Sequence, residues 1–419
     1  MIKKIIISAC LLLSLVSFSQ EGTSSPYSFY GIGDMKFNGT IESRSMGGLS
    51  IAQDTTHVNL QNPAGLANLR WTAFTIGGGV NYTKQKSEAA SGKAQKSTLD
   101  YLALGIPLSK KFGAAFGLIP YSSVGYRITN ENPDPTQISE RFNGWGGLNR
   151  VFLGVGYKIM PNLNIGVNAY YNFGKIQSNS LEYIPDPEVS IGTRELNVAN
   201  LMGINYNIGM MYKTKINEKL TFLSSLYYTP KSNLKSENTR NIATVTYNAN
   251  FDVQVEDPQD DEVFETDLEL PQKWSLGAGI GDSKKWLFGA EVSFQDIGKL
   301  GNNYNTIDNV TYEKYQKYSI GGYYTPNSNP FSSYFKRITY RGGFKFEKTG
   351  LVVNSTSIND TAVSFGMGFP IIGSLSNVNL GVEYGKKGTT SNDLVQENYF
   401  NINLSFSLND KWFVRSKFH

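Results

Sequence analysis

The sequence predicts an all-β protein: a 14-stranded antiparallel transmembrane β-barrel with an N-terminal plug (hatch) inside its lumen. Three observations lead to this prediction. Aromatic residues make up 13% of the chain, and glycine is abundant at 42. Mean hydropathy is nevertheless negative, at −0.30. Apolar and polar residues also alternate over stretches of about ten residues, which is the length of a tilted membrane strand.

The first element is a secretory signal peptide, residues 1–19. Two lysines precede the apolar stretch Ile5–Val16, and small residues follow it, which predicts cleavage after Ser19 or Gln20. The single cysteine, Cys10, lies inside the apolar stretch, so we expect no disulfide in the mature chain. Removal of the two lysines lowers the formal charge from +4 to +2, which predicts no nucleic-acid partner.

Strict alternation identifies the strands of the barrel, residues 71–408. Residues 162–173 read NLNIGVNAYYNF, and residues 398–408 repeat the pattern. The polar faces are rich in Asn, Gly and Ser, which suits a wet lumen. Charged side chains are costly in lipid, so we expect Glu291 and Glu383 to face inward. Strands of a soluble β-sandwich also alternate but average about five or six residues, which favours the barrel.

Short connections alternate with long polar ones, the pattern of short periplasmic turns and long outer loops. We expect residues 240–256, which also alternate, to form a hairpin extension of an outer loop. Residues 409–419 are a periplasmic C-terminal tail. Aromatic residues near the strand ends predict interfacial girdles: Trp71, Tyr82, Trp274, Trp286, Tyr323 and Tyr324. The strands are expected at 71–83, 97–108, 111–125, 148–159, 162–176, 200–214, 220–230, 267–281, 285–297, 313–325, 336–349, 357–369, 376–386 and 395–408.

Residues 20–70 precede the first strand. They are too many for a simple tail and too few for a domain with its own core. A 14-strand barrel leaves a lumen that its wall side chains do not fill. The apolar residues of this stretch are therefore expected to pack against the inner wall, as a plug.

Other chemistry finds little support in the sequence. Asp54 and His57 have the spacing of half a hydrolase dyad, but no G-x-S-x-G motif accompanies them, and a polar plug histidine is favoured. Residues 277–285, GAGIGDSKK, lack the Gly-Lys-Ser/Thr of a phosphate loop. The acidic stretch 256–269 has the oxygen ligands that calcium prefers but no D-x-D-x-D-G frame, which favours a solvated loop.

The quoted features together resemble the FadL/TodX family of outer-membrane transporters for hydrophobic compounds. The residues that carry the resemblance are SPYSFYGIGD (25–34), RSMGGLSIA (44–52), NPAGL (62–66), LPQKWSLGAGI (270–280) and SLNDKWF (407–413). The likeness covers essentially the whole mature chain. The plug motif is Asn62, Pro63 and Ala64.

The resemblance implies passive uptake of long-chain fatty acids or aromatic hydrocarbons through an outer-membrane channel. It implies that the start of the plug reaches into an apolar ligand pocket, and that a kink in the third strand releases the ligand sideways into the bilayer. Gly117, Pro120 and Gly125 would form this lateral gate, since proline and glycine weaken a strand; Pro120 marking the rim is the other interpretation. The expected pocket residues are Tyr27, Phe29, Tyr30, Leu99, Tyr101, Ile119 and Tyr121.

The inward faces are more polar than a conduit for apolar compounds requires, which keeps a second function open. The chain would then be a structural or adaptor subunit of an outer-membrane secretion or assembly complex. We expect no enzyme activity, no metal and no cofactor. The expected partners are a hydrophobic small molecule or lipid, the lipids of the outer membrane and, in the second case, other outer-membrane proteins.

Overall fold

The computed structural model describes residues 22–134, 136–185, 191–248, 252–282, 285–297 and 309–412. The predicted signal peptide and residues 413–419 of the predicted tail lie outside these ranges. Within the described residues, no helix has both the length and the apolar character needed to span a membrane.

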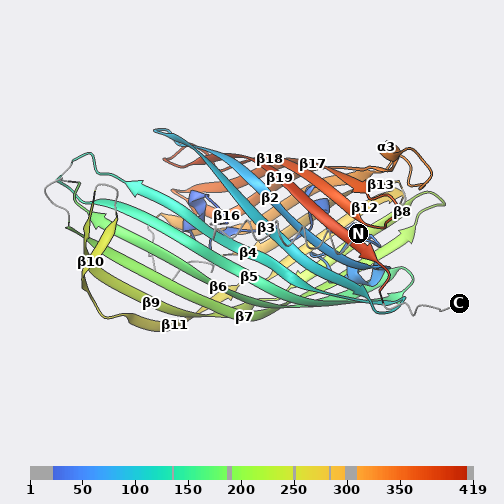
Figure 1. Ribbon diagram of the computed structural model, residues 1–419, viewed down its shortest axis with the longest axis horizontal. Coiled ribbons are helices and arrows are strands. Elements are labelled where there is room, and N and C mark those ends of the chain that lie inside the picture. The colour runs from blue at the N-terminus through green and yellow to red at the C-terminus, as the bar shows by residue number, and fades with distance from the viewer. Residues whose placement is uncertain are drawn as a thin grey trace.

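The chain forms one closed antiparallel barrel, as predicted (Figure 1). The first strand, β2 (Thr72–Lys86), pairs with the last, β19 (Gln396–Asp410), from Lys86 to Thr72. Both chain ends of the barrel therefore lie at one end, which is the periplasmic end of an outer-membrane barrel. The other full-length strands are β3 (Ser91–Pro107), β4 (Phe112–Asn130), β5 (Ser139–Met160), β6 (Leu163–Tyr183), β7 (Ile191–Lys215), β13 (Trp286–Asp296), β16 (Thr339–Val353), β17 (Thr356–Pro370) and β18 (Asn377–Lys387).

Three further spans are each divided into consecutive strands, which completes the fourteen. Prolines divide two of them. Pro230 separates β8 (Thr221–Thr229) from β9 (Ser232–Tyr247), and Pro271 separates β11 (Glu262–Leu270) from β12 (Lys273–Asp282). Proline has no N–H to donate to a ladder. The third divided span consists of β14 (Val310–Tyr312) and β15 (Lys314–Tyr324).

The strands continue further on the outer side than the sequence predicted. Residues 127–147 and 177–199 were expected to be loops, but β4 to β7 extend into them. The apolar face that identified the spans ends where lipid ends, whereas the backbone ladder needs no lipid and continues above it. The described part of 240–256 agrees with the predicted hairpin extension, since β10 (Val253–Pro258) pairs antiparallel with the end of β9.

Large apolar side chains cover the outside of the barrel and polar ones its inside. Leu153 is 61% exposed and Phe288 56%, whereas Asn168 is 1% exposed. Glu291 and Glu383 face inward as predicted and are each 7% exposed. Tyr323 corrects the predicted girdle: it packs against an inner cluster that contains Met46, because Tyr323 and Tyr324 alternate and only one of them can face outward.

Residues 22–71, here called the N-terminal segment, lie against the inner faces of the strands and appear in blue inside the barrel in Figure 1. The segment has only short elements. These are η1 (Pro26–Phe29), β1 (Asp34–Met35), α2 (Ile41–Arg44) and η2 (Pro63–Asn68). Asn62 caps η2 by accepting a hydrogen bond from the Ala64 amide, and every residue of η2 is buried.

Two rows of glycines in the wall allow this segment to approach closely. Gly113, Gly156, Gly166 and Gly209 are successive ladder partners across β4 to β7 and form the first glycine row. A Cβ at any of them would come closer than 3.0 Å to an atom of residues 62–67. Only glycine leaves room for this contact, so the NPAGL turn (62–66), which contains the plug motif, lies directly on the backbone of the wall.

The second glycine row lies across β12, β13, β15 and β16 and contacts residues 46–51 of the N-terminal segment. Its members, which are also successive ladder partners, are Gly279, Gly289, Gly321 and Gly343. A Cβ at these positions would clash with Ile51, with the Met46 carbonyl or with the Gly47 amide. The two glycine rows therefore hold residues 46–51 and 62–67 against different parts of the wall.

Candidate functional site

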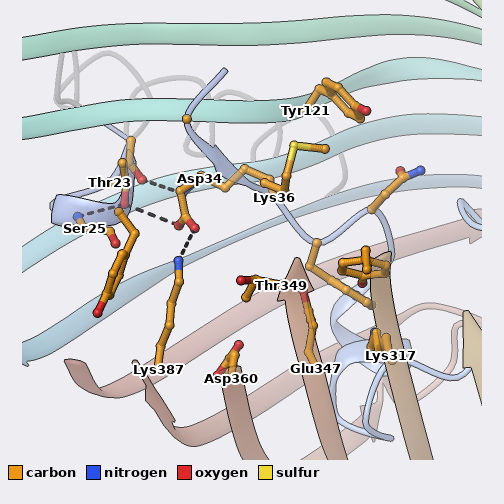
Figure 2. Close-up of a pocket in the computed structure, with 18 of the residues that line it drawn as sticks. Thr23, Ser25, Asp34, Lys36, Tyr121, Lys317, Glu347, Thr349, Asp360 and Lys387 are labelled. Carbon is orange, nitrogen blue, oxygen red and sulfur yellow. Dashed lines mark hydrogen bonds and ion pairs between the residues drawn. The ribbon is translucent and has the colours of Figure 1, made fainter. Parts of the chain in front are cut away.

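A cavity of about 380 Å³ lies in the lumen above α2 and η2. Its walls come from the beginning of the N-terminal segment and from inward side chains of most strands. The volume falls within the range of small-molecule pockets, about 300–1,000 Å³. Figure 2 shows Asp34, Lys36, Tyr121 and Lys387 pointing into it.

Ion pairs connect the N-terminal segment to the wall around this cavity. The Lys387 Nζ lies 2.6 Å from Asp34 Oδ1, as Figure 2 shows. Arg44 pairs with Asp100 of β3 at 3.2 Å. The Ser25 hydroxyl donates to Glu397 of β19 at 2.8 Å. The segment is thus bonded to β18, β19 and β3, which lie within one run of four neighbouring strands.

Three cations on the cavity wall lack such a partner. Within the described part of the chain, no carboxylate is within 4 Å of Arg150 in β5, Lys273 in β12 or Lys317 in β15. Arg150 stacks on Tyr121, with 3.8 Å from Cζ to the ring centre, and its buried Nη2 has no hydrogen-bond partner. Lys273 interacts electrostatically with both of the other cations and also with Glu347 and Glu291, and Glu347 is the ladder partner of Lys317. We call Arg150, Lys273 and Lys317 the cation triad.

An apolar cluster adjoins the triad. Ile32 of the N-terminal segment packs with Leu148, Leu201, Leu234 and Leu270 of the wall. Tyr121 and Tyr315 pack against the same cluster, and each also holds a triad cation against its ring. The lumen therefore presents an apolar surface and a positive charge side by side.

The wall is incomplete between β3 and β4. Their ladder ends at Leu102 and Leu118, so β3 from Ser91 and β4 to Asn130 have no pairing with each other above that point. β1 occupies part of the free edge of β4, where Asp34 pairs with Ser123. The Lys36 amide donates to the Tyr121 carbonyl at 2.9 Å. Short strand β1 thus substitutes for β3 along a few residues.

The predicted gate residues lie at this break. Gly117 is within the last paired stretch of β4, and Pro120 follows its end. The register of β4 against β5 shifts between Pro120 and Ser122. The Gly125 amide donates to the Ser28 hydroxyl at 3.1 Å instead of to a β3 carbonyl.

The predicted pocket residues do not all line the cavity. Tyr27, Tyr30 and Tyr121 line the lumen cavity. Phe29 packs edge-on against Tyr126 at 5.0 Å between ring centres. The others, Tyr101 and Ile119, belong to the core cluster under α2 and η2.

The prediction that Leu99 lines the pocket was wrong. It is 45% exposed and does not line the cavity. The ladder skips Asp100, because Gly77 pairs with Tyr101 and Gly78 with Leu99. This bulge breaks the strict alternation, so Leu99 and Tyr101 do not share a face as the spacing predicted.

The plug motif lies where the segment meets the first glycine row. The Asn62 side-chain amide donates to the Ser225 hydroxyl at 2.8 Å and to the Leu226 carbonyl at 3.1 Å. Pro63 and Ala64 lie over Gly166. These three residues form the floor of the lumen and do not touch the cavity.

Sequence reasoning missed the cation triad and the Asp34–Lys387 pair. A signal was present, because Lys317 and Lys387 occur in or at the end of otherwise alternating strands, where a lysine is costly unless it faces the lumen. The pairing partners could not be identified, since the bonded residues are far apart in the chain.

Two other groups of polar residues from the sequence analysis are His57 with Asp54, and the acidic stretch 256–269. His57 Nδ1 lies 2.5 Å from Asp54 and its Nε2 lies 3.5 Å from Glu42, within the N-terminal segment. The acidic stretch lies along β10 and β11, and in the described ranges no group of His, Cys, Asp and Glu could hold a metal.

The closed wall and the occupied lumen define the class of fold: a 14-stranded antiparallel β-barrel like those of FadL homologues. Solved structures share this fold. The toluene transporter TbuX of Ralstonia pickettii has a TM-score of 0.60 and 13% identity, covering 89% of this chain and 99% of that one. A FadL homologue of Pseudomonas aeruginosa has a TM-score of 0.59 and 9% identity, covering 90% and 98%. The toluene transporter TodX of Pseudomonas putida has a TM-score of 0.58 and 17% identity, covering 90% and 98%.

The family model BamG matches residues 1–419, and the chain belongs to the BamG family. No curated protein matches the sequence. The solved structures are too distant in sequence to carry more than their fold.

Proposed function

We propose that the protein is a passive outer-membrane channel for hydrophobic molecules that carry an anionic group, with long-chain fatty acids as the type substrate. The observation that carries this proposal is the cation triad beside an apolar cluster in one lumen cavity. A carboxylate would supply the partner that Arg150 Nη2 lacks, and the alkyl chain would lie against Ile32 and its neighbours. Aromatic hydrocarbons carry no anionic group that could pair with the cation triad.

The exit in this proposal is the break between β3 and β4. It lies next to the cavity, and β1 partly closes it with only a two-residue ladder. Residues 22–37 would move to release cargo, whereas the NPAGL floor would stay in place. Lateral exit avoids the floor, which blocks the route straight through the lumen.

Uptake measurements test the substrate. Cells that carry the wild-type chain are expected to take up palmitate, and Lys273→Met/Lys317→Met should lower its uptake at least tenfold. Toluene uptake serves as the internal control and should not fall. Lys235→Met, at an exposed position of β9, is the matched control for loss of a lysine. Equal palmitate uptake by the triad variant and the wild type would refute the proposed substrate class.

Cross-linking tests the route. The mature chain is predicted to lack cysteine, so a bis-maleimide can join Thr98→Cys in β3 to Ser123→Cys in β4 across the break. The control pair, Leu104→Cys and Phe116→Cys, joins the same strands where they already pair. We expect uptake to stop only when the first pair is linked. Unchanged uptake through a linked break would exclude the lateral route.

A second function, an adaptor subunit, is favoured by the periplasmic end. The turn between β15 and β16 exposes Phe331 at 96% and Phe335 at 73%, and Ile372 in the turn after β17 is 75% exposed. Such side chains suit contact with another protein. Gentle detergent extraction should then recover a stoichiometric partner that Phe331→Ser/Phe335→Ser loses. A wild-type chain that purifies alone would rule this function out.

A further inference from the structure

A second cleft, of about 620 Å³, opens at the outer part of the β3–β4 break. Lys93 and Lys96 of β3 form one side, and Arg127 of β4 forms the other. Asn143 and Trp145 of β5 and Asn179 of β6 also line the cleft. Ser24 and Lys96 line both this cleft and the lumen cavity, so the two spaces adjoin.

The charge of the cleft is of one sign. Its described lining includes three cations and no carboxylate. Within the described residues, neither Lys93 nor Arg127 forms an ion pair. The lumen cavity is different, because its lining also contains carboxylates, and Arg44, Lys345 and Lys387 each form an ion pair with one of them. Two cations without an ion pair, Lys93 and Arg127, facing each other across a recess favour an anion with more than one negative charge.

Two polar atoms in the cleft lack a partner. The side-chain oxygens of Asn143 and Asn179 are buried and accept no hydrogen bond from any described group. Arg127 stands opposite Asn143 in the ladder, and Asn143 stands opposite Asn179, so the three form one cross-strand row. Because buried acceptors are costly when unsatisfied, the row suits a ligand that brings hydroxyl or amide donors beside its anion. Trp145 lies next to this row, and its ring Nε1 donates to Gln177 at 2.8 Å.

The height of the cleft indicates which molecules reach it. Lys96 is eleven residues above Pro107, the periplasmic end of β3. At about 3.3 Å per residue and a tilt of about 40°, this corresponds to a rise of roughly 28 Å. The apolar band of an outer-membrane barrel is about 25 Å tall, so the cleft opens at the level of the outer-leaflet headgroups.

We propose that this cleft binds the phosphorylated sugar headgroup of an outer-leaflet glycolipid. The cations Lys93, Lys96 and Arg127 would bind the phosphate, and the oxygens of Asn143 and Asn179 would accept from sugar hydroxyls or an acylated sugar nitrogen. The wall break lets the acyl chains of the lipid remain in the bilayer. This site is separate from the cation triad and does not depend on transport.

The experiment uses the full-length chain purified in detergent, with diphosphorylated lipid A as probe and native mass spectrometry as readout. Wild-type protein is expected to retain lipid A, and Lys93→Ala/Arg127→Ala should weaken retention at least tenfold. Lys219→Ala/Lys235→Ala removes the same charge at exposed positions outside the cleft and should bind as the wild type does. Heat-modifiable migration on a denaturing gel confirms that each variant is folded.

Competition separates the headgroup from simpler anions. Asn143→Ser should weaken lipid A binding while leaving the weak binding of inorganic phosphate unchanged. Dephosphorylated lipid A should bind poorly. Competition by inorganic phosphate as effective as that by lipid A would show a general anion site and overturn the proposal. Glucosamine 1-phosphate binding as tightly as lipid A would identify a soluble sugar phosphate instead, and a double variant that binds like the wild type would exclude the cleft.

Discussion

The N-terminal segment has two parts that the barrel holds in different ways. Residues 40–69 rest on the two glycine rows and bury apolar side chains such as Leu49 and Leu66. Residues 22–37 do not lie on a glycine row: they pair with β4 over two residues, form polar side-chain bonds such as Asp34–Lys387, and bury only Tyr27 and Ile32 against apolar clusters of the wall. The lower part is therefore a fixed floor, and the upper part can be displaced at lower cost.

The largest expected effect comes from filling the first glycine row. Gly166→Val adds a branched side chain where a single Cβ already clashes with Pro63 and Ala64. Overpacking of this kind typically costs about 1–3 kcal/mol, and here the neighbour is backbone that cannot rotate away. We expect a sharp fall in the heat-modifiable, folded fraction and in the urea midpoint.

Gly342→Val is the control, because a Cβ at Gly342 meets nothing within 4 Å. It should fold with an unchanged midpoint. Equal urea midpoints for Gly166→Val and Gly342→Val would mean that residues 62–67 shift at little cost. Residues 40–69 would then be no more firmly fixed than residues 22–37.

A smaller loss is expected from removing the polar anchor of the floor. Asn62→Ala leaves the Leu226 carbonyl and the Ala64 amide without their partner. Unsatisfied buried groups cost about 1–3 kcal/mol, so the free energy of unfolding in urea should fall by an amount in that range. Asn130→Ala, at an exposed position, should be neutral. A neutral Asn62→Ala would show that apolar contacts alone hold the turn.

The two parts also differ in how far they could be predicted. Small residues at 44–52 and 62–66 predict a compact element, and the alternation of polar and apolar residues predicted the fourteen spans. The glycines that receive the element are spaced by strand lengths, so only the register reveals that Gly113, Gly156 and Gly166 adjoin. The bulge at Asp100 reverses the faces of Leu99 and Tyr101 in the strand, but no residue type in the sequence marks its position. Bonds such as Asp34–Lys387 join residues too distant in the chain for local patterns to connect them.

An intermediate case is His57, which lies in the floor but is held by charge. Burial opposes its protonation, but Asp54 and Glu42 outweigh that effect and keep the pKa of His57 above its ordinary value. Burial likewise raises the pKa of Asp54, and His57 outweighs it, so the pKa of Asp54 is lowered overall.

The pH dependence follows from these signs. The His57 contribution is complete below the unfolded-state pKa of about 6.5 and is lost as pH rises through the higher folded-state pKa. The Asp54 contribution is present above about pH 3.9 and is lost as pH falls through its lowered pKa. Urea midpoints should therefore be higher at pH 5.5 than at pH 9, and His57→Gln should remove this difference. A difference that persists in His57→Gln would assign it to other groups.

The smallest effect on overall stability is expected where the upper part is bonded to the wall. Asp34→Asn removes the charge that Lys387 faces at 2.6 Å but preserves the shape of the side chain. Because the floor does not depend on this pair, and Glu397 and Asp360 still act on Lys387, the free energy of unfolding in urea should fall by less than it does in Asn62→Ala. Hydrogen exchange should accelerate at the amides that join β1 to β4, including Lys36, which donates to Tyr121. Exchange at Ala64, on the floor, should not change. Asp134→Asn, in an exposed outer loop, should alter neither. If protection at Lys36 and at Ala64 fell together, the N-terminal segment would open as one unit, and release of residues 22–37 alone could not serve as the exit step.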